Sequence, residues 1–334
     1  MSCEREKKEV IYWAARLNEK GLISAKSGNI SWRISDKEIL VTSHDSYLGY
    51  LDEKEICLVD LEGNIFEGME QLTSEQELHL SIYKKFKDIK VVIHAHSPYT
   101  TAFFYYFNTL EVFSYENRFY LGDLKTINQE TPTVAKVEPV LEALDKNNIV
   151  VLKYHGVVAI GKNFKEAFSL IELLEKQAEV NLLIKGLGLK SDTSLSQDIE
   201  EKEVEKESIK RYKMLSEEHA RRLTELVNND SEVQELGKKY GLTCTLAVKN
   251  QDTGEVMCFY YENGRIVRVD KNEDAEFVII GNEDILRKVF NKEIDPFVAS
   301  TQGKVKTKGN FAKMSKWYPV MVRTFKLWEQ APVF

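Results

Sequence analysis

Residues 91–102 read VVIHAHSPYTTA, and this stretch decides how the first half of the chain is interpreted. The β-branched run at residues 89–94 predicts a buried strand. Residues two apart in a strand face the same side, so His94 and His96 are expected to point together from its end. The pair therefore predicts two ligands of a metal site, although paired strand histidines also occur as ordinary polar residues.

A third histidine stands in a similar place. His155 follows a second buried strand, predicted at residues 149–154, and precedes Gly156. The chain has six histidines, and three of them occupy strand ends of this kind. Three imidazoles would leave open positions for water or substrate, as catalytic zinc sites do. The sequence thus predicts a divalent-metal site at His94, His96 and His155.

The composition limits the possible functions. With 334 residues, 43% of them hydrophobic, the chain can fill two domain cores. A net charge of −7 provides no basic footprint, which argues against a nucleic-acid partner. Four cysteines without CxxC spacing and the charged start MSCEREKKEV favour a reduced, cytoplasmic compartment. No apolar run approaches the roughly 20 residues of a membrane span, so none is expected.

Hydrophobic periodicity divides the chain into two domains. Residues 1–190 predict an α/β domain, and residues 209–334 an α+β domain with an antiparallel sheet. The charged stretch 191–208, which contains EEKEVEKE, predicts a linker between them. The helices are expected at residues 4–19, 74–86, 163–184, 209–227 and 311–327, with another that Asn282 caps and that carries Ile285, Leu286 and Val289. The strands are expected at residues 38–42, 55–60, 89–94, 149–154, 157–160, 243–249, 255–261, 265–269 and 276–280.

Glu75 lies at a predicted helix start, where Thr73 or Ser74 can serve as the cap. A carboxylate beside a divalent ion can move protons on a carbon next to a polarised carbonyl. The free N–H groups of that helix end can also hold an anion. The alternative is a first-turn acid that complements the helix dipole.

A second polar segment reads SGNIS at residues 27–31. Gly28 allows a close backbone approach to a ligand, Asn29 offers amide donors, and Lys26 adds a positive charge beside them. Taken alone, the segment is equally typical of an ordinary turn.

Four ordered blocks together resemble the class II aldolase family, which includes fuculose-phosphate aldolases and ribulose-phosphate epimerases. The blocks are SGNIS at 27–31, TSEQELHLSIY at 73–83, VVIHAHSPYTTA at 91–102 and YHGVVAIGKNFKEAF at 154–168. The resemblance covers about residues 5–190. It implies an α/β/α domain with a central, largely antiparallel sheet.

The resemblance also implies roles for single residues. His94, His96 and His155 match the family's metal ligands, and Glu75 matches its catalytic acid and base. Asn29, Thr73 and Ser74 match phosphate-contacting positions, and Gly28 matches the close-approach glycine. Lys26 stands where the family has a small hydroxyl residue and is expected beside them as a substrate or phosphate contact. Tyr115 matches a tyrosine that works in the neighbouring subunit's site, which implies a homotetramer.

The chain departs from the family pattern around the phosphate. Thr42, Ser43, His44 and Asp45 stand where the family often has a Thr-Pro-Ser/Thr-Gly segment. An aspartate near a phosphate is unfavourable by charge, and Lys26 is placed to offset it. Zinc is the first expectation for three imidazoles, with manganese, cobalt and iron as alternatives.

The second domain resembles, more weakly, the sterol-carrier-protein type-2 fold. The resemblance rests on hairpin signals and on FVIIGNEDILRKVFNKEIDPFVASTQGKVKTKGNFAKM at residues 277–314. Such domains fold around an apolar tunnel, which implies an apolar ligand. The alternative is an accessory module with a filled core, to which aromatic residues contribute. These residues are Tyr260, Tyr261, Phe277, Phe297 and Trp317.

Four functions remain open from the sequence. The first is a metal-dependent aldolase that acts on a sugar phosphate or related ketose through a metal-stabilised enediolate. The second is an epimerase or dehydratase on the same scaffold. The third is a non-enzymatic scaffold, against which the retained histidines and Glu75 argue. The fourth gives the main role to the C-terminal domain as a lipid carrier.

Overall fold

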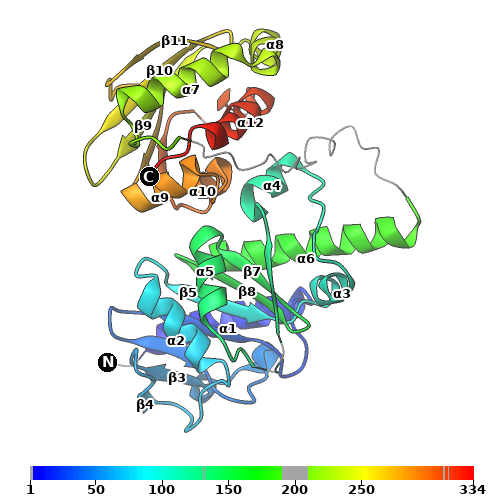
Figure 1. The fold of residues 1–334 in the computed structure, drawn as a ribbon. Coiled ribbons are helices and arrows are strands. Elements are labelled where there is room, and N and C mark those ends of the chain that lie inside the picture. Colours follow the sequence, from blue (N-terminus) through cyan, green and yellow to red (C-terminus); the bar gives the residue numbers. More distant parts are fainter. Residues whose placement is uncertain (1–2, 130, 132, 190–209, 311–312, 315) are drawn as a thin grey trace. The chain divides into compact units, whose positions relative to one another are not determined.

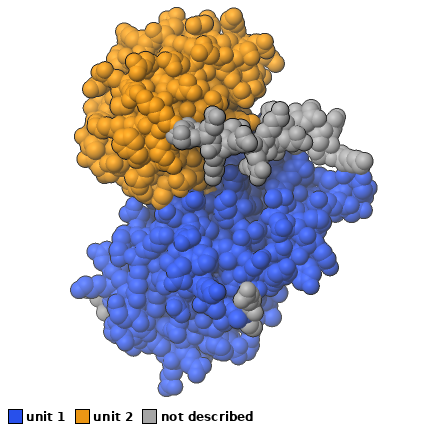
Figure 2. Space-filling view, in the orientation of Figure 1, with its two compact units in different colours: residues 1–192 blue, residues 193–334 orange. Residues whose placement is uncertain are grey.

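The structure is a computed structural model that describes residues 3–129, 131, 133–189, 210–310, 313–314 and 316–334. The chain forms two compact units, Met1–Asp192 and Thr193–Phe334, which are coloured separately in Figure 2. Each unit is described by itself. The linker predicted at residues 191–208 lies outside the described residues.

The N-terminal unit is built on one eight-stranded sheet with the order β4-β3-β2-β1-β5-β8-β7-β6 (Figure 1). Every neighbouring pair is antiparallel except β6 and β7, which confirms the largely antiparallel sheet. The strands are β1 (Asn29–Arg33), β2 (Ile39–Thr42), β3 (Ile56–Val59), β4 (Ile65–Glu67), β5 (Val91–Ala95), β6 (Lys125–Asn128), β7 (Ile149–Lys153) and β8 (Gly156–Gly161).

A separate apolar core lies on each face of this sheet, because side chains alternate along a strand. Val91 and Ile93 of β5 pack with α1 (Glu4–Glu19), α3 (Pro98–Tyr106) and α6 (Phe164–Gly186). The other face packs with α2 (Gln76–Lys85) and α5 (Glu138–Lys146), and Val92 of β5 belongs to that core. The result is the expected α/β/α arrangement. The unit also contains α4 (Tyr115–Leu121), η1 (Leu48–Tyr50) and η2 (Glu53–Glu55).

A buried carboxylate ties α3 to α6 directly after the HAH segment. Ser97 precedes α3 without capping it through its side chain. Glu175 of α6 takes over that role, because it accepts the N–H groups of Tyr99 at 2.9 Å and Thr100 at 2.8 Å. It also accepts the Thr100 hydroxyl at 2.8 Å and is only 5% exposed. The start of α3, two residues beyond His96, is therefore fixed by a charge-assisted contact.

The C-terminal unit contains a five-stranded sheet with the order β11-β10-β9-β12-β13. Asn263 and Gly264 both have positive φ angles at the turn between β10 and β11, as the Asn-Gly hairpin signal predicts. The elements are α7 (Glu217–Asn229), α8 (Ser231–Tyr240), β9 (Cys244–Asn250), β10 (Val256–Glu262), β11 (Arg265–Asp270), β12 (Phe277–Gly281), α9 (Glu283–Phe290), α10 (Pro296–Thr301), β13 (Lys306–Lys308), α12 (Tyr318–Leu327) and η3 (Trp328–Gln330).

Three expectations for this unit need correction. The helix expected from residue 209 begins at Glu217, where the Ser216 side chain caps it by accepting the N–H of His219. The sheet is not wholly antiparallel, because β12 pairs in parallel with β9. The chain leaves β11 at one edge and returns to the far side of β9, which fixes that direction. The final helix begins at Tyr318, not at residue 311, with Pro319 in its first turn, where proline is well tolerated.

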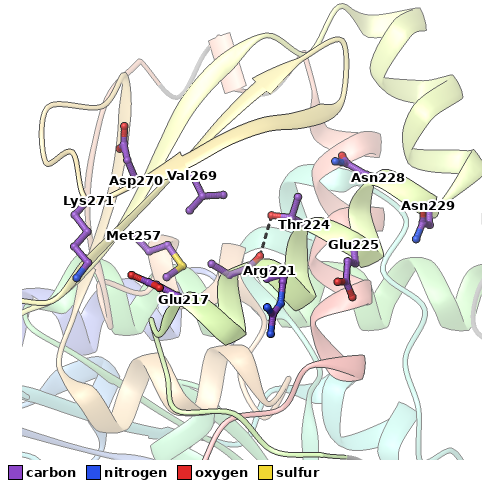
Figure 3. A pocket seen from close by; sticks show the side chains of 11 residues that line it. Glu217, Arg221, Thr224, Glu225, Asn228, Asn229, Met257, Val269, Asp270 and Lys271 are labelled. Carbon is purple, nitrogen blue, oxygen red and sulfur yellow. Dashed lines mark hydrogen bonds between the residues drawn. The ribbon is translucent and has the colours of Figure 1, made fainter.

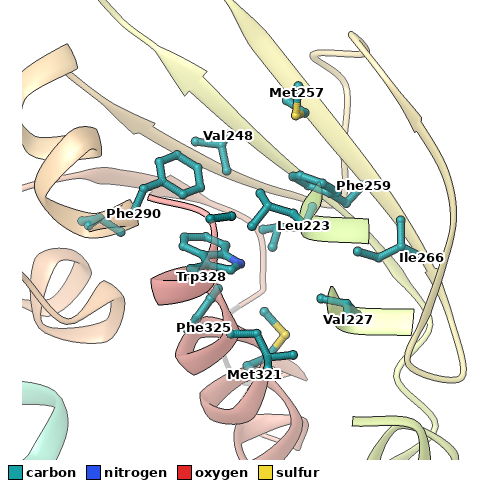
Figure 4. Close-up of a cluster of buried hydrophobic side chains, with 14 of the residues drawn as sticks. Leu223, Val227, Val248, Met257, Phe259, Ile266, Phe290, Met321, Phe325 and Trp328 are labelled. Carbon is teal, nitrogen blue, oxygen red and sulfur yellow. The ribbon is translucent and has the colours of Figure 1, made fainter. Parts of the chain in front are cut away.

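Side chains fill the interior of the C-terminal unit between its sheet and helices (Figure 4). The ring centroid of Trp328 lies 4.6 Å from that of Phe290 and 4.7 Å from that of Phe325. Phe277 and Trp317 are also buried. Tyr261 is buried too, whereas Tyr260 and Phe297 are only partly buried against the cores. The aromatic residues thus contribute to a packed core.

We expect Glu175→Ala to lower the stability of the N-terminal unit by about 3 kcal/mol, because two buried N–H groups lose a charged acceptor. Thermal and urea unfolding of the full chain, followed by the N-terminal transition, measure the change. Glu172→Ala is the matched control on the same helix. Its 2.8 Å pair with Lys20 is largely exposed, so its loss should cost less than about 1 kcal/mol. Equal effects of both substitutions would contradict the anchoring role.

Candidate metal centre

Three imidazoles converge at the end of β5. His94 and His96 come from the strand and the residue after it, and His155 from the turn between β7 and β8. The Nε2 atom of His94 lies 2.9 Å from that of His96 and 3.0 Å from that of His155. All three pairs of ring centroids are 4.8 Å apart. Strands β5 and β8 are neighbours in the sheet, which explains how residues 61 positions apart meet.

The contacts of His94 test whether this cluster fits a cation. Its Nδ1 lies 3.1 Å from the carbonyl oxygen of Val157, so Nδ1 carries the proton and donates it. Nε2 of His94 then has a single lone pair but lies beside two further ring nitrogens. One lone pair cannot accept hydrogen bonds from both of them. Tetrahedral zinc–nitrogen bonds would place such nitrogens roughly 3.3 Å apart, close to the observed spacing. The three side chains therefore fit a divalent transition metal.

The electrostatics of the cluster favour neutral imidazoles, the form that binds metals. Burial, followed by the nearby imidazoles of His96 and His155, holds the pKa of His94 well below its usual range. Burial, with a contribution from His155, lowers the pKa of His96 to about 4. Burial also lowers the pKa of His155. All three rings therefore keep their lone pairs at neutral pH.

Two glycines permit the strands on either side of β5 to come close. Gly28 has a φ of +82°, and a Cβ there would lie 2.8 Å from the carbonyl oxygen of His94. A Cβ on Gly156 would approach the carbonyl oxygen of Ala95 more closely than real Cβ atoms do. Both positions thus require glycine for packing reasons. Residue 28 also lies close to the strand that carries His94, and its predicted close approach to a substrate stays a prediction.

Glu75 lies beside the histidines, immediately before α2. Its carboxylate is 4% exposed, and Oε1 is 3.8 Å from Nε2 of His155. Both oxygens lie 3.2 Å from the N–H of Val134. Burial raises the pKa of this carboxyl, and the Val134 N–H partly offsets that shift. The predicted catalytic acid and base is therefore placed next to the predicted metal ligands.

The predicted phosphate-contacting segments meet at the same end of the sheet. Asn29 is paired with His94 in the β1–β5 register. The N–H of Thr73 donates to the carbonyl of Thr42, whose hydroxyl accepts the N–H of Ile30. Asn29 and Thr73 are buried, whereas Ser74 is exposed. Residues 29, 42 and 73 thus lie together, as an anion site would need.

Lys26 lies close to Asp45, as the charge argument suggested. Its Nζ is 2.7 Å from Oδ2 of Asp45, and the two side chains are 58% and 63% exposed. The hydrogen bond and charge of Lys26 lower the pKa of Asp45. Because this pair neutralises itself, Lys26 offers an incoming anion less attraction than a free lysine would.

Tyr115 is the first residue of α4 and is 51% exposed. Helix α4 contacts α6. The structure describes a single chain, so a role in a neighbouring subunit's site stays a prediction. His79, one helical turn after Glu75, is expected from the sequence to have a core or supporting role rather than to bind the metal. In the structure it is fully buried and hydrogen bonded to Asn29.

The C-terminal unit carries a groove of about 640 Å³ between α7 and the β10–β11 hairpin. Figure 3 shows Glu217 and Thr224 on the helix facing Met257 and Val269 on the strands, whereas the guanidinium of Arg221 points away from the strands. This volume is within the range of small-molecule pockets. No helix among the described residues is both long and apolar enough to cross a membrane.

Comparison with known proteins identifies the class of each unit. The model of the class II aldolase and adducin N-terminal domain family matches residues 8–182, more than half of the chain. The model of the SCP-2 sterol transfer family matches residues 221–321. These matches confirm both resemblances seen in the sequence. The chain belongs to the class II aldolase and adducin N-terminal domain family and carries an SCP-2 domain after it.

Individual relatives share the fold and differ in their reactions. L-fuculose phosphate aldolase of Methanocaldococcus jannaschii is 33% identical over 178 residues, which are 53% of this chain and 96% of that protein. The 3-oxo-tetronate 4-phosphate decarboxylase of Haemophilus influenzae is 30% identical over 174 residues, 50% of this chain and 82% of that one. The solved sugar-phosphate aldolase of Thermotoga maritima covers 57% of this chain and 99% of its own, with 27% identity and a TM-score of 0.51.

We expect Gly156→Ala to lower both the metal content and the melting temperature, because the added methyl group would push β8 and His155 away from β5. Metal analysis of purified protein and thermal unfolding measure the two effects. Gly186→Ala is the control: nothing lies within 4 Å of a Cβ there, so stability should stay equal or rise by up to about 1 kcal/mol. Full metal loading of the Gly156 variant would disprove the close-packing argument.

Proposed function

We propose that the N-terminal unit is a metal-dependent aldolase acting on a small phosphorylated ketose. The observation that carries the proposal is the convergence of three neutral imidazoles beside one buried carboxylate. His94, His96 and His155 would hold the cation, with zinc preferred and manganese, cobalt or iron as alternatives. When bound, the cation would supply positive charge to the carbonyl and neighbouring hydroxyl oxygens of the substrate.

Glu75 is the proton carrier in this proposal. Burial raises the pKa of this carboxyl toward neutral pH. A carboxyl with such a pKa can both release and accept a proton during the reaction. In the cleavage direction, the carbon–carbon bond breaks and its electron pair stays on the carbon next to the carbonyl. Glu75 then gives its proton to that carbon. The Val134 N–H, 3.2 Å from both carboxylate oxygens, orients the group.

The phosphate of the substrate would bind where residues 29, 42 and 73 meet. Asn29, Thr73 and Ser74 provide neutral amide, hydroxyl and backbone donors there. Gly28 keeps β1 close to β5, so that Asn29 stands beside His94. The Lys26–Asp45 pair would lie near this end without adding a net charge.

A decarboxylase is the second candidate, because a relative of similar identity carries that name. Both reactions leave an electron pair on a carbon next to a carbonyl, and they differ in the fragment that departs. For an aldehyde fragment to leave, the hydroxyl that becomes its carbonyl must lose a proton, whereas a departing carboxylate carries no such proton. We propose that Tyr115 of a neighbouring subunit in a homotetramer takes this hydroxyl proton in cleavage and returns it to the aldehyde oxygen in the condensation direction, which favours the aldolase over the decarboxylase, epimerase and dehydratase alternatives.

We expect Glu75→Gln to lower turnover by roughly a thousandfold or more while metal content stays unchanged, since the amide cannot carry a proton. Ketoses with and without phosphate are screened for release of an aldehyde or of carbon dioxide, alongside metal analysis. Glu77→Gln, at an exposed position in the first turn of α2, is the control and should keep full activity. Undiminished turnover in the Glu75 variant would rule out its role.

We further propose that the C-terminal unit holds an apolar or amphipathic molecule in the groove of Figure 3. The groove combines an apolar floor of Ala220, Met257 and Val269 with charged groups at its rim. The core beside it is filled by side chains, so the groove is the better candidate for such a ligand.

Native mass spectrometry of the full chain is expected to show a co-purified apolar molecule. Val269→Lys should abolish that extra mass, because it places a charge on the floor of the groove. Val267→Lys changes a 52% exposed residue on the same strand and should leave the mass in place. Retention of the molecule by the Val269 variant would exclude the groove as its site.

A further inference from the structure

A buried chain of polar side chains connects the interior of the N-terminal unit to the predicted anion site. Nε2 of His79 lies 2.5 Å from Oδ1 of Asn29, and Nδ1 lies 2.6 Å from the hydroxyl of Ser31. The Ser31 hydroxyl lies 2.9 Å from that of Tyr83, which is 3.1 Å from the carbonyl of Lys90. His79, Ser31 and Tyr83 have no measurable exposure, whereas Asn29 retains 7%. Asn29, at one end of this chain of hydrogen bonds, is thus the one member that solvent reaches in part.

The protonation of His79 decides the direction of this chain. Burial lowers the pKa of the imidazole to about 3, so the ring is neutral and carries one proton. If Nε2 holds the proton, it donates to Oδ1 of Asn29, and Nδ1 accepts the Ser31 hydroxyl. Ser31 then accepts the Tyr83 hydroxyl, and among the described residues the Lys90 carbonyl keeps only the N–H of Arg33, 2.7 Å away, as its donor. If Nδ1 holds the proton, it donates to Ser31, Ser31 donates to Tyr83 and Tyr83 donates to the carbonyl of Lys90, and the Asn29 amide must turn its nitrogen toward His79.

Only the first arrangement prepares Asn29 for an anion. With Oδ1 facing His79, the NH₂ group of Asn29 is directed away from the chain. Within the described residues, that nitrogen makes no hydrogen bond. In the reversed arrangement Asn29 would present an oxygen, which repels an anion. The 2.5 Å contact places the oxygen against His79 and so agrees with the first arrangement. That arrangement gives up the 3.1 Å hydrogen bond from Tyr83 to the Lys90 carbonyl, which still accepts the N–H of Arg33.

We propose that His79 is a positioning residue whose Nε2–H group holds the Asn29 amide with its NH₂ group turned toward the phosphate of the substrate. Asn29 contacts the anion, and His79 acts through Asn29 without touching the substrate. The phosphate in this statement rests on the proposed function, whereas the orientation of the amide does not. Packing alone would explain a buried histidine, but it would not select one tautomer.

The first test determines the tautomer directly. The full chain is labelled with ¹⁵N-histidine, and long-range proton–nitrogen correlations are recorded for its six histidines. The signals of His79 are those that disappear in His79→Gln. A proton on Nε2 and a bare Nδ1 support the inference. A proton on Nδ1 overturns it, whatever is found for phosphate.

The second test measures the affinity for inorganic phosphate by calorimetry, with melting temperature and metal content as checks on folding. His79→Leu should bind phosphate roughly tenfold to a hundredfold more weakly, because the Asn29 amide is no longer held. His79→Gln can still donate from a similar position and should recover most of the affinity. Asn29→Ala should match His79→Leu, and the double variant should bind no more weakly than either.

Tyr83→Phe is the matched control for a purely structural role. It removes a hydroxyl that is equally buried and belongs to the same chain, but in the proposed arrangement Ser31 still donates to His79. Its melting temperature should fall, while its phosphate affinity should stay unchanged. An equal loss of affinity in the Tyr83 and His79 variants overturns the proposal. If the unsubstituted protein binds no phosphate although Nε2 is protonated, the substrate class is wrong and the orientation of Asn29 stands.

Discussion

The close approach of three backbones around β5 is the constraint on which the rest of the N-terminal unit depends. β1 and β8 flank this strand, and glycines at positions 28 and 156 contact its last carbonyl groups. A side chain at either position would force the neighbouring strand outward. The positions of Asn29 on one side and His155 on the other follow from this packing. The placement of the side chains that form the site therefore follows from the packing of these three backbones.

Much of this unit could be predicted from its sequence. The β-branched runs at β5 and β7 mark strands that are buried on both faces, and such strands give a strong local signal. The histidine cluster could be predicted because its three members stand at the ends of these two strands. Helices α3, α4 and α5 and strands β1, β4 and β6 were not predicted. Helix α3, PYTTAFFYY, has no polar stripe to reveal its period, and Glu175, distant in sequence, anchors its first turn.

Other features depend on contacts that sequence periodicity does not contain. The parallel pairing of β12 with β9 reflects the route of the chain across the sheet. The supporting role of His79 depends on Ser31, which lies 48 positions away but adjacent in space. Ser31 itself is a polar residue inside a buried strand, and that anomaly is the one signal that could have drawn attention to the chain of hydrogen bonds.

The residues gathered around the three imidazoles are scattered from position 28 to position 156. During synthesis the ribosome releases the chain from its N-terminus, so His94 and His96 emerge well before their third partner. A nascent chain that ends before β8 has neither the complete ligand set nor the strand that closes against β5. Capture of the proposed cation would consequently be a late event in biogenesis, coupled to closure of the sheet, and shorter fragments would not compete with the finished protein for scarce cellular metal.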